Sequence, residues 1–297
     1  MKTYLLSLLV AQFPLPIAAK PFLASMCYRG ETMLNIKSSY KATDNFSYIS
    51  SLYDFNNKLY LITGGTSGIG LATAEEMIQL GARVIITGRN SKKLSELSKK
   101  HGSRIIPVNI DSSSPESGNE LVEVVRKNGM LDGLWLNAAI AQLDSLKDVS
   151  AQKYSQIMDI NVRGPILQLA ALSECLKEKS SVIVTSSSSV YEGAKLTSLY
   201  AASKGALSAA VRVWSSELAC KGIRVNSLAL GPVSTNFRRF LSSEQQTEFE
   251  SNVVGKLPLG RAASAPEIAN VAIFLFSHAS SYITGSEIPV DGGLIKR

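Results

Sequence analysis

Two tyrosine–lysine pairs are the residues whose types and spacing best suit chemistry. Tyr191 is followed four residues later by Lys195, and Tyr200 is followed at the same distance by Lys204. In a helix, residues four apart lie on one face, so the lysine ammonium can sit beside the phenol. A tyrosine titrates near pH ~10, and a neighbouring cation lowers that pKa. Such a phenol can supply the proton that a developing alkoxide needs when a carbonyl is reduced.

The sequence around each pair favours the second one. Tyr191 is followed by Gly193 in a segment typical of a loop between strand and helix, whereas Tyr200 begins Tyr-Ala-Ala-Ser-Lys-Gly-Ala-Leu, a good helix start. Carbonyl chemistry also needs a hydroxyl that orients the substrate, and the four serines at 186–189 offer candidates at the end of a strand pattern. We therefore expect Tyr200 to be the proton donor and Lys204 to lower its pKa.

A glycine-rich segment, Thr-Gly-Gly-Thr-Ser-Gly-Ile-Gly at 63–70, lies between an apolar run and an amphipathic stretch. Glycines let the backbone turn tightly and approach a pyrophosphate, whose charge then meets free N–H groups at a helix N-terminus. This position predicts a nicotinamide dinucleotide site. Its residues would be Gly64, Thr66, Ser67, Gly68, Ile69 and Gly70.

The end of the second strand pattern indicates which cofactor binds. Enzymes that use NAD typically have an acidic residue there for the ribose 2′-hydroxyl, but this sequence reads Thr87-Gly88-Arg89. Gly88 leaves room, and the guanidinium of Arg89 can pair with a 2′-phosphate. NADP (as NADPH) is therefore favoured, with NAD as the weaker alternative. Asp111, after the third strand pattern, is predicted either to hydrogen-bond the adenine or to cap a helix.

These residues need a scaffold of alternating strands and helices, and the sequence from Lys58 onward has that pattern. Strand patterns cover 58–63, 83–87, 104–108, 133–136, 181–186, 224–230 and 287–290, and helical spacing covers 69–80, 91–100, 116–128, 151–177, 199–219 and 265–276. The alternation predicts a single α/β domain over 58–297. We expect a Rossmann-type doubly wound parallel sheet of about seven strands, with helices on both faces and ligands at the carboxyl ends of the strands.

The composition of the chain is that of a globular protein. It has 297 residues, 45% of them hydrophobic and 19% charged, and a net charge of +7 whose surplus is concentrated at 89–104. No motif typical of nucleic-acid binding accompanies this charge. Three cysteines (Cys27, Cys175 and Cys220) at irregular spacing argue against a disulfide framework, and the isolated His101 and His278 predict no metal site.

Residues 1–57 form an N-terminal extension outside the α/β pattern. The early Lys2 and the apolar run at 4–10 partly resemble a signal peptide, although the run is far shorter than the roughly 20 residues that span a bilayer. The alternatives are a poorly ordered segment, or a true start further along the chain at Met33. We expect a cytoplasmic protein with no membrane contact, and a membrane-associated or exported protein is the minority alternative.

Taken together, residues 58–293 resemble the short-chain dehydrogenase/reductase family, in its branch with a Thr-Gly-x-x-x-Gly-x-Gly loop. The resemblance rests on the glycine loop, the Tyr200–Lys204 pair and four further stretches, which are Asn137-Ala138-Ala139, Asn161-Val162-Arg163-Gly164, Gly231-Pro232-Val233-Ser234-Thr235 and 258–293. In that family the catalytic serine precedes the tyrosine by thirteen residues, which selects Ser187. Asn161 matches the fourth catalytic residue, which helps a bound water to relay protons toward the lysine. The resemblance also implies cofactor contacts from Asn137, Tyr200, Lys204, Gly231, Val233 and Thr235.

The resemblance extends to keto-reductases such as 3-oxoacyl-thioester reductases and implies that NADPH reduces a ketone. Sugar, steroid and polyketide carbonyls are further candidates. One rival is an enoyl reductase, against which the four-residue Tyr–Lys spacing speaks. The other is a non-catalytic NADP-binding regulator or scaffold, against which the four intact catalytic positions speak. Family members also pair through helices corresponding to 151–177 and 199–219, which implies a homodimer or homotetramer.

The segment at 236–256 corresponds to the mobile lid of the family. Its apolar residues (Phe237, Phe240, Leu241 and Phe249) would line an apolar pocket or simply pack on the core, and Arg238 and Arg239 would meet an acidic group of the substrate. Tyr191 and Glu192, just after the serine run, are further candidates to face the pocket.

Overall fold

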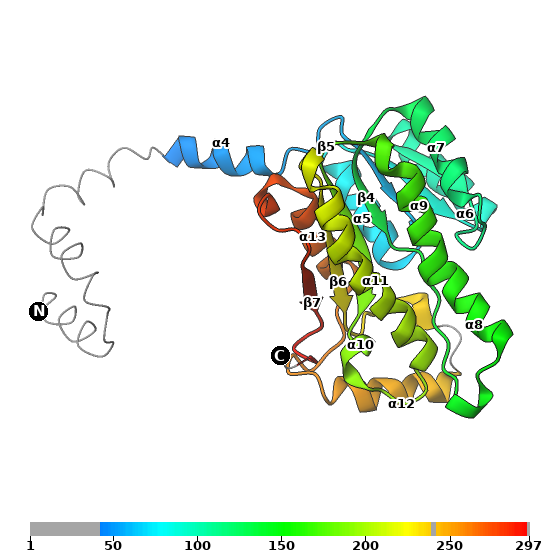
Figure 1. Ribbon diagram of the computed structural model, residues 1–297. Helices are drawn as coiled ribbons and strands as arrows, with labels where there is room; N and C mark the ends of the chain where they lie inside the picture. Colours follow the sequence, from blue (N-terminus) through cyan, green and yellow to red (C-terminus); the bar gives the residue numbers. More distant parts are fainter. Residues whose placement is uncertain (1–41, 239–241, 296–297) are drawn as a thin grey trace, which may run out of the picture. The chain divides into compact units, whose positions relative to one another are not determined.

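The computed structural model describes residues 42–238 and 242–295 (Figure 1). The chain divides into two units, 1–51 and 52–297. Helix α4 (Ala42–Leu52) occupies a segment in which the sequence showed no clear periodicity. Its serines and asparagine have low helix propensity, which is why this helix was missed. The signal-like run, Met33 and Cys27 lie outside the described residues.

The second unit is built on a parallel sheet of seven strands in the order β3-β2-β1-β4-β5-β6-β7. Its strands are β1 (Leu59–Ile62), β2 (Arg83–Gly88), β3 (Ile105–Asn109), β4 (Leu131–Leu136), β5 (Leu176–Ser187), β6 (Arg224–Leu230) and β7 (Glu287–Val290). This arrangement confirms the predicted doubly wound Rossmann-type fold. The chain reverses its direction of travel across the sheet between β1 and β4, and a crevice for ligands opens outside the carboxyl ends of the strands at such a point.

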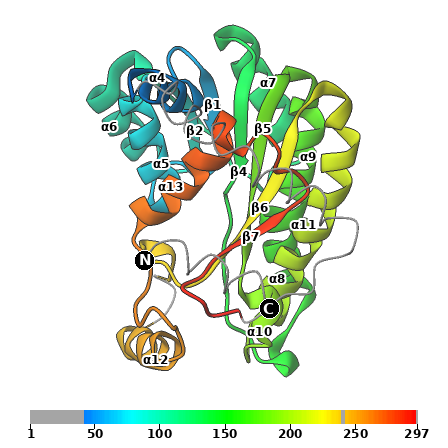
Figure 2. The ribbon, with the colours of Figure 1, turned by 90° about the vertical axis from the view of Figure 1, so that its left-hand side faces the viewer.

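Helices cover both faces of the sheet (Figure 2). One face carries α5 (Gly68–Gln79), α6 (Ser91–His101) and α13 (Ala265–Phe276), and the other carries α7 (Ser117–Asn128), α9 (Gly164–Leu172) and α11 (Ser198–Glu217). Two further helices, α10 (Ser189–Glu192) and α12 (Ser243–Val254), lie at the end of the sheet where the strands finish. These two helices are therefore placed to wall the crevice.

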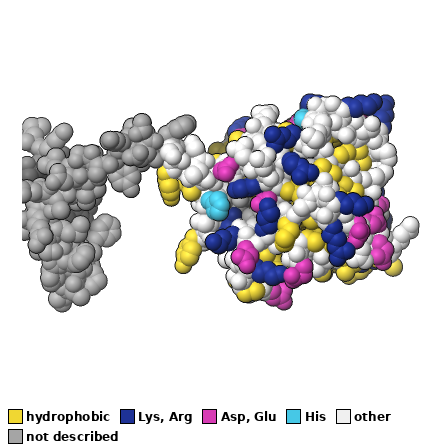
Figure 3. All heavy atoms as spheres, turned by 90° about the horizontal axis from the view of Figure 1, so that it is seen from above, with side chains coloured by type: hydrophobic (Ala, Val, Ile, Leu, Met, Phe, Trp, Pro, Cys, Tyr) yellow, Lys and Arg dark blue, Asp and Glu magenta, His cyan; other side chains and the backbone are white. Residues whose placement is uncertain are grey.

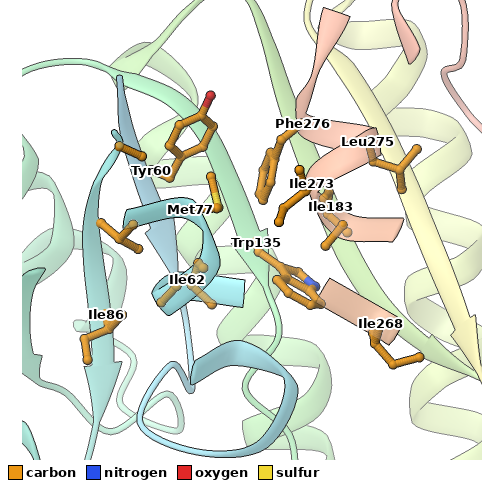
Figure 4. Close-up of a cluster of buried hydrophobic side chains, with 14 of the residues drawn as sticks. Tyr60, Ile62, Met77, Ile86, Trp135, Ile183, Ile268, Ile273, Leu275 and Phe276 are labelled. Carbon is orange, nitrogen blue, oxygen red and sulfur yellow. The ribbon is translucent and has the colours of Figure 1, made fainter. Parts of the chain in front are cut away.

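The core between the sheet and helices α5 and α13 contains closely packed aromatic rings (Figure 4). The ring centroids of Tyr60 and Phe276 are 5.0 Å apart, and Trp135 is fully buried beside them. A Cβ at Gly133 would lie 2.7 Å from atoms of both rings. The missing side chain of Gly133 therefore allows both rings to pack onto the middle of the sheet.

The predicted helix at 151–177 was wrong in its continuity and in its end. The structure has α8 (Ala151–Met158), one π-helical stretch (Asp159–Arg163) and then α9, and β5 already begins at Leu176. β5 pairs as Leu176 with Leu131 and resumes with Ser181 opposite Gly133, so the residues between bulge out of the ladder. The polar residues of this bulge hid the start of the strand, because they break the apolar run that signals a buried strand.

Charged and apolar side chains are mixed over one face of the second unit. On the face shown in Figure 3, Lys and Arg side chains are interspersed with Asp and Glu side chains. Across the described residues, every helix is either too short or too polar to cross a bilayer.

Candidate active site

A cavity of about 540 Å³ lies at the carboxyl ends of the strands. Its wall is made from the loops that follow β1, β2, β3, β4, β5 and β6, together with residues of α11 and α12. Every cofactor residue predicted from the sequence lines it except Gly70, which lies just behind the wall. The crevice required by the strand order is therefore the place where the predicted site residues meet.

The glycine loop has the shape that a pyrophosphate requires. Gly64 has φ 65°, and a Cβ there would lie 3.1 Å from the Cα of Ala138. A Cβ on Gly70 would lie 2.9 Å from both the carbonyl oxygen of Gly64 and the side-chain nitrogen of Asn137. These approaches bring the loop close to the end of β4, and α5 begins at Gly68 inside the cavity wall. The first N–H groups of α5 can therefore bind the negative charge of a dinucleotide.

Arg89 and Asp111 mark the other end of the dinucleotide site. Arg89 Nη1 is 3.8 Å from Asp111 Oδ2, and both side chains are well exposed, at 67% and 46%. Asp111 accepts hydrogen bonds from the backbone N–H and hydroxyl of Ser113 at 2.9 and 2.8 Å, and the backbone bond is the main cause that lowers the pKa of Asp111. Asp111 thus stabilises a turn, and α7 begins only at Ser117. The guanidinium of Arg89 is loosely held and can turn toward a 2′-phosphate.

Asn137 holds three strand ends together. Its backbone N–H and side-chain amide donate to the hydroxyl and carbonyl of Thr63 at 2.9 and 3.0 Å, and its Oδ1 accepts from Thr185 at 3.1 Å. Trp135 donates in turn to the hydroxyl of Thr185 at 2.9 Å. The amide of Asn137 therefore fixes β1 and β5 on either side of β4, a positioning role that adds to the predicted cofactor contact.

Gly231, Val233 and Thr235 form the wall after β6. A Cβ on Gly231 would lie 2.6 Å from the Cα of Asp291, which shows how closely two backbone segments approach there. Val233 pairs with Ala263 in an isolated parallel bridge. A Cβ on Gly68 would lie 3.5 Å from the side chain of Thr235, which is an ordinary van der Waals distance. This loop therefore lies next to the glycine loop in the cavity wall.

The predicted catalytic residues meet at the opposite end of the cavity. Ser187 ends β5, while Tyr200 and Lys204 lie one turn apart in the first half of α11. The ammonium of Lys204 is 5.8 Å from the centroid of the Tyr200 ring and donates to the carbonyl of Thr185 at 2.8 Å. Lys204 is only 1% exposed. A serine hydroxyl, a phenol and a buried amine are therefore placed together, as carbonyl reduction requires.

The pKa values of Tyr200 and Lys204 are shifted by their surroundings in directions that the sequence did not predict. Burial raises the pKa of Tyr200 to about 12, although a hydrogen bond with Ser187 opposes this rise. Burial also lowers the pKa of Lys204 to about 7. The expectation was that Lys204 lowers the pKa of Tyr200, and the net shift of that pKa is upward instead. Desolvation is the largest cause of both shifts, because each charged form loses its hydration.

Asn161 is fully buried in the π-helical stretch. Its Oδ1 accepts from the backbone N–H of Ile140, and its Nδ2 donates to the carbonyl of Ile140, both at 2.9 Å. The same nitrogen donates to Ser203, the neighbour of Lys204, at 3.1 Å. Asn161 thus fixes the loop after β4 against α11. A π-helical turn at such a position is typical of a functional site.

The structure separates the two tyrosine–lysine pairs. Tyr191 lies in the short helix α10, and its hydroxyl donates to the carboxylate of Glu287 on β7. Lys195 is exposed after the end of this helix. Tyr191 was expected to face the cavity and does not line it, whereas Glu192, also expected, does. Tyr191 and Glu192 are adjacent in a short helix and point to different sides. Sequence spacing alone could not show which of the two faces the cavity.

The lid segment is partly helical. It contains a 3-10 turn (Asn236–Arg238) and α12, and Phe237 and Val253 line the cavity. The ring of Phe237 lies 6.4 Å from the ring of Tyr200, which supports the predicted apolar contact. Arg239, Phe240 and Leu241 lie outside the described residues, as do the side chains of Arg238 and Phe249.

Some residues of the site were missed by sequence reasoning. Thr185 holds both Lys204 and Asn137, and the segment 140–143 with Thr197 lines the cavity beside Glu192. Thr185 sits inside an apolar strand pattern, and the other residues fall in irregular segments. No motif of type or spacing distinguishes them, so only their position in space reveals them.

Known proteins that are similar to this chain in sequence and fold are oxidoreductases. A model of the family described as "Enoyl-(Acyl carrier protein) reductase" matches residues 64–295. The chain is 33% identical over 247 residues to an L-xylulose reductase of Caenorhabditis elegans, covering 81% of this chain and 97% of that protein. It is also similar to the crystal structure of a short-chain dehydrogenase/reductase, a glucose/ribitol dehydrogenase of Brucella melitensis, with TM-score 0.77, 31% identity and coverage of 82% and 99%. A blue fluorescent protein from a metagenomic library, crystallised in complex with NADPH, has TM-score 0.74, 28% identity and coverage of 82% and 100%.

Proposed function

The chain belongs to the short-chain dehydrogenase/reductase family of oxidoreductases, and on that basis we propose that it reduces a ketone to a secondary alcohol with NADPH. The observation that supports this proposal most strongly is the placement of Ser187, Tyr200 and Lys204 at one end of a cavity whose other end carries Arg89. The glycine loop joins the two ends. A cofactor bound along this path would present its nicotinamide to the catalytic residues.

The cofactor, when bound, supplies the hydride, and the residues of the chain handle the oxygen and the proton. The Ser187 hydroxyl is placed to hydrogen-bond the substrate carbonyl and polarise it. Tyr200, protonated across the physiological range because burial raises its pKa, donates the proton to the developing alkoxide. Lys204, fixed by the carbonyl of Thr185, is placed to stabilise the tyrosinate that forms. Asn161 and Asn137 hold these elements in register.

We propose that Arg89 selects NADPH over NADH. Its guanidinium is exposed at the cavity wall, and among the described residues its only charged partner is Asp111, at 3.8 Å. A bidentate bond between a guanidinium and a phosphate is stronger than such a loose pair. A solved structural relative binds NADPH, which supports the same choice.

The variant Arg89→Ala tests this choice. We expect KM for NADPH to rise about tenfold or more, because charge-assisted hydrogen bonds to a phosphate contribute ~1.5–3 kcal/mol. KM for NADH should change less than threefold. Steady-state kinetics with both cofactors on the same ketone measure this. Equal activity of the natural protein with NADH, or no effect of the substitution on NADPH, would contradict the proposal.

Two other activities compete with ketone reduction. The matched family model carries the name of an enoyl reductase, which supports testing reduction of a carbon–carbon double bond. A non-catalytic NADP-binding regulator or scaffold is the second. The four-residue spacing of Tyr200 and Lys204 and the intact Ser187 and Asn161 favour a keto-reductase over both.

A substrate panel distinguishes the three activities. Purified protein is incubated with NADPH and matched ketones, secondary alcohols and enoyl thioesters, and cofactor oxidation is followed by absorbance. We expect turnover of ketones, the reverse reaction of alcohols with NADP, and no turnover of enoyl thioesters. Turnover of the enoyl compounds alone would establish the first rival, and NADPH binding without any turnover would support the second.

We further propose that residues 58–297 are the catalytic domain and that 1–57 is an N-terminal extension, whose last residues from Leu52 onward pack as part of the second unit. The irregular cysteine spacing and the choice of NADPH support a cytoplasmic location. Exposed apolar side chains on α8, α9 and α11, which are Tyr154, Ile166 and Val213, support a homodimer or homotetramer. Light scattering of the purified protein would show a monomer if that assembly is wrong, and N-terminal sequencing of the protein from cells would show whether the extension is removed.

A further inference from the structure

We propose that the substrate is an uncharged ketone that carries hydroxyl groups, and that Glu192 disfavours ketones that carry a carboxylate. This inference rests on the proposed reduction of a ketone and specifies the substrate class of the same site. The first observation behind it is the place of Glu192 in the cavity wall.

The chain fixes Glu192 one helical turn beyond the catalytic serine. The backbone N–H of Ser188 donates to the carbonyl of Leu230 at 2.9 Å, which ties the start of the turn to the end of β6. The backbone N–H of Glu192 then donates to the carbonyl of Ser188 at 3.2 Å. Gly193, with φ 60°, ends the turn directly afterwards. The backbone of Glu192 is therefore fixed close to the end of β5, and its exposed side chain lines the same cavity as Ser187.

A hydrogen-bond network on the other side of α10 makes this wall rigid. The hydroxyl of Tyr191 donates to the carboxylate of Glu287, and the other oxygen of Glu287 accepts from Ser208 at 2.6 Å. Ser208 is in turn 2.8 Å from the hydroxyl of Ser186. The short helix is thus fastened to β7, to α11 and to the end of β5. A wall that is fixed before binding discriminates by charge more sharply than one that can move away.

The substrate end carries negative charge without a free positive charge among the described residues. Four charged side chains line the cavity: Arg89 and Asp111 at the dinucleotide end, the buried Lys204, and Glu192. Lys204 is already bound to the carbonyl of Thr185. In the part of the chain that the structure describes, no hydrogen bond or ion pair holds the Glu192 carboxylate. A substrate carboxylate would therefore meet repulsion that no cation among the described wall residues compensates.

The same wall offers acceptors for hydroxyl groups. Gln142 lines the cavity and donates from Nε2 to Gln156 at 3.0 Å, while its Oε1 is buried without a hydrogen-bond partner among the described residues. A buried acceptor without a donor is unfavourable, and a rotation of the Gln142 amide that lets a substrate hydroxyl reach Oε1 would remove that cost. The Glu192 carboxylate can accept a second hydroxyl. A ketone with several hydroxyl groups matches both acceptors, and a hydrocarbon ketone matches neither.

The test compares two ketones of the same length, a ketopentose and a keto acid with a terminal carboxylate in place of one hydroxymethyl group. We expect the natural protein to have a kcat/KM about tenfold higher for the ketopentose, from the repulsion between two charges across a partly hydrated cavity. Glu192→Gln should bring the ratio close to one, and Glu192→Lys should invert it. Added salt should reduce the preference of the natural protein, because the interaction is electrostatic.

Matched variants separate this effect from a general change in charge. Glu178→Lys makes the same substitution at an exposed residue in the bulge of β5, and it should leave the ratio of the two substrates unchanged. Gln142→Leu should lower kcat/KM for the ketopentose about tenfold and leave a deoxygenated ketone unaffected. Thermal unfolding of each variant shows whether it is folded.

The outcomes distinguish the inference from the function on which it rests. The inference is wrong, and the function stands, if ketones are reduced but the keto acid is preferred. The same holds if the ratio of kcat/KM for the two ketones does not change with the charge of residue 192. A preference for the keto acid would point instead to Arg238 and Arg239 as its partners. If no ketone is reduced with NADPH, the proposed function itself fails.

Discussion

Replacing Tyr200 with phenylalanine is expected to lower kcat for ketone reduction about 10³-fold, within the ~10²- to 10⁴-fold range that a general acid contributes. The substitution removes the hydroxyl and keeps the ring, whose centroid lies 6.4 Å from that of Phe237. The wall of the cavity should therefore keep its shape. The loss should appear in kcat, because the proton is needed in the transition state.

Two measurements make this prediction specific. NADPH binding, followed by the fluorescence of the cofactor, should change less than threefold in Tyr200→Phe. The matched variant Tyr191→Phe, which has the same spacing to a lysine, should keep at least a tenth of kcat, because its hydroxyl contacts Glu287 outside the cavity. Equal losses in both variants, or no loss in Tyr200→Phe, would show that another group donates the proton.

The second large effect is expected at Lys204. Lys204→Met keeps most of the side-chain volume and removes the buried amine, which is 1% exposed and donates to Thr185 at 2.8 Å. We expect kcat to fall about a hundredfold or more, because the tyrosinate that forms on proton transfer loses its stabilising neighbour. Lys195→Met is the matched control and should retain full kcat, since Lys195 is exposed.

The same substitution should not destabilise the protein. Burial lowers the pKa of Lys204 to about 7, so a charged amine at this position is unfavourable to the folded state. Methionine removes that cost and loses one hydrogen bond, which contributes only ~1 kcal/mol. The free energy of unfolding of Lys204→Met at pH 7 should therefore equal or exceed that of the natural protein, although activity is lost.

The pH dependence of stability gives an independent check. In the natural protein Lys204 is deprotonated above about pH 7 when folded. In the unfolded chain it keeps its proton until its ordinary pKa of ~10.4. Between these values the unfolded state binds more protons, so the free energy of unfolding should rise with pH, by up to ~1.4 kcal/mol per unit. Tyr200, whose pKa is raised, opposes this only above pH ~10.

Urea unfolding between pH 7 and 9, without cofactor, measures this contribution. The difference between the natural protein and Lys204→Met should shrink as the pH rises. A constant difference would mean that Lys204 keeps its ordinary pKa in the fold, and the stability argument would then be wrong. The kinetic prediction does not depend on that outcome.

The sequence by itself determined the scaffold and predicted most of the residues that line the cavity. The strands were predicted because fully buried strands are continuous apolar runs, and the glycine loop because its residues are adjacent along the chain. The bounds of β6 and β7 were predicted to the residue. Tyr200 and Lys204 were chosen because one helical turn sets their separation. Each of these features depends on neighbours in sequence.

The tertiary structure alone decided which residues of the site contact one another and in which direction their pKa values shift. The directions of the pKa shifts at Tyr200 and Lys204 depend on burial by β5 and α11, and burial is contributed by segments far apart in the chain. The same holds for the contacts of Asn161 with Ile140 and for the choice of Glu192 over Tyr191 as a wall of the cavity. Spacing fixes which side chains share a face, and only long-range packing fixes which of those faces is removed from water.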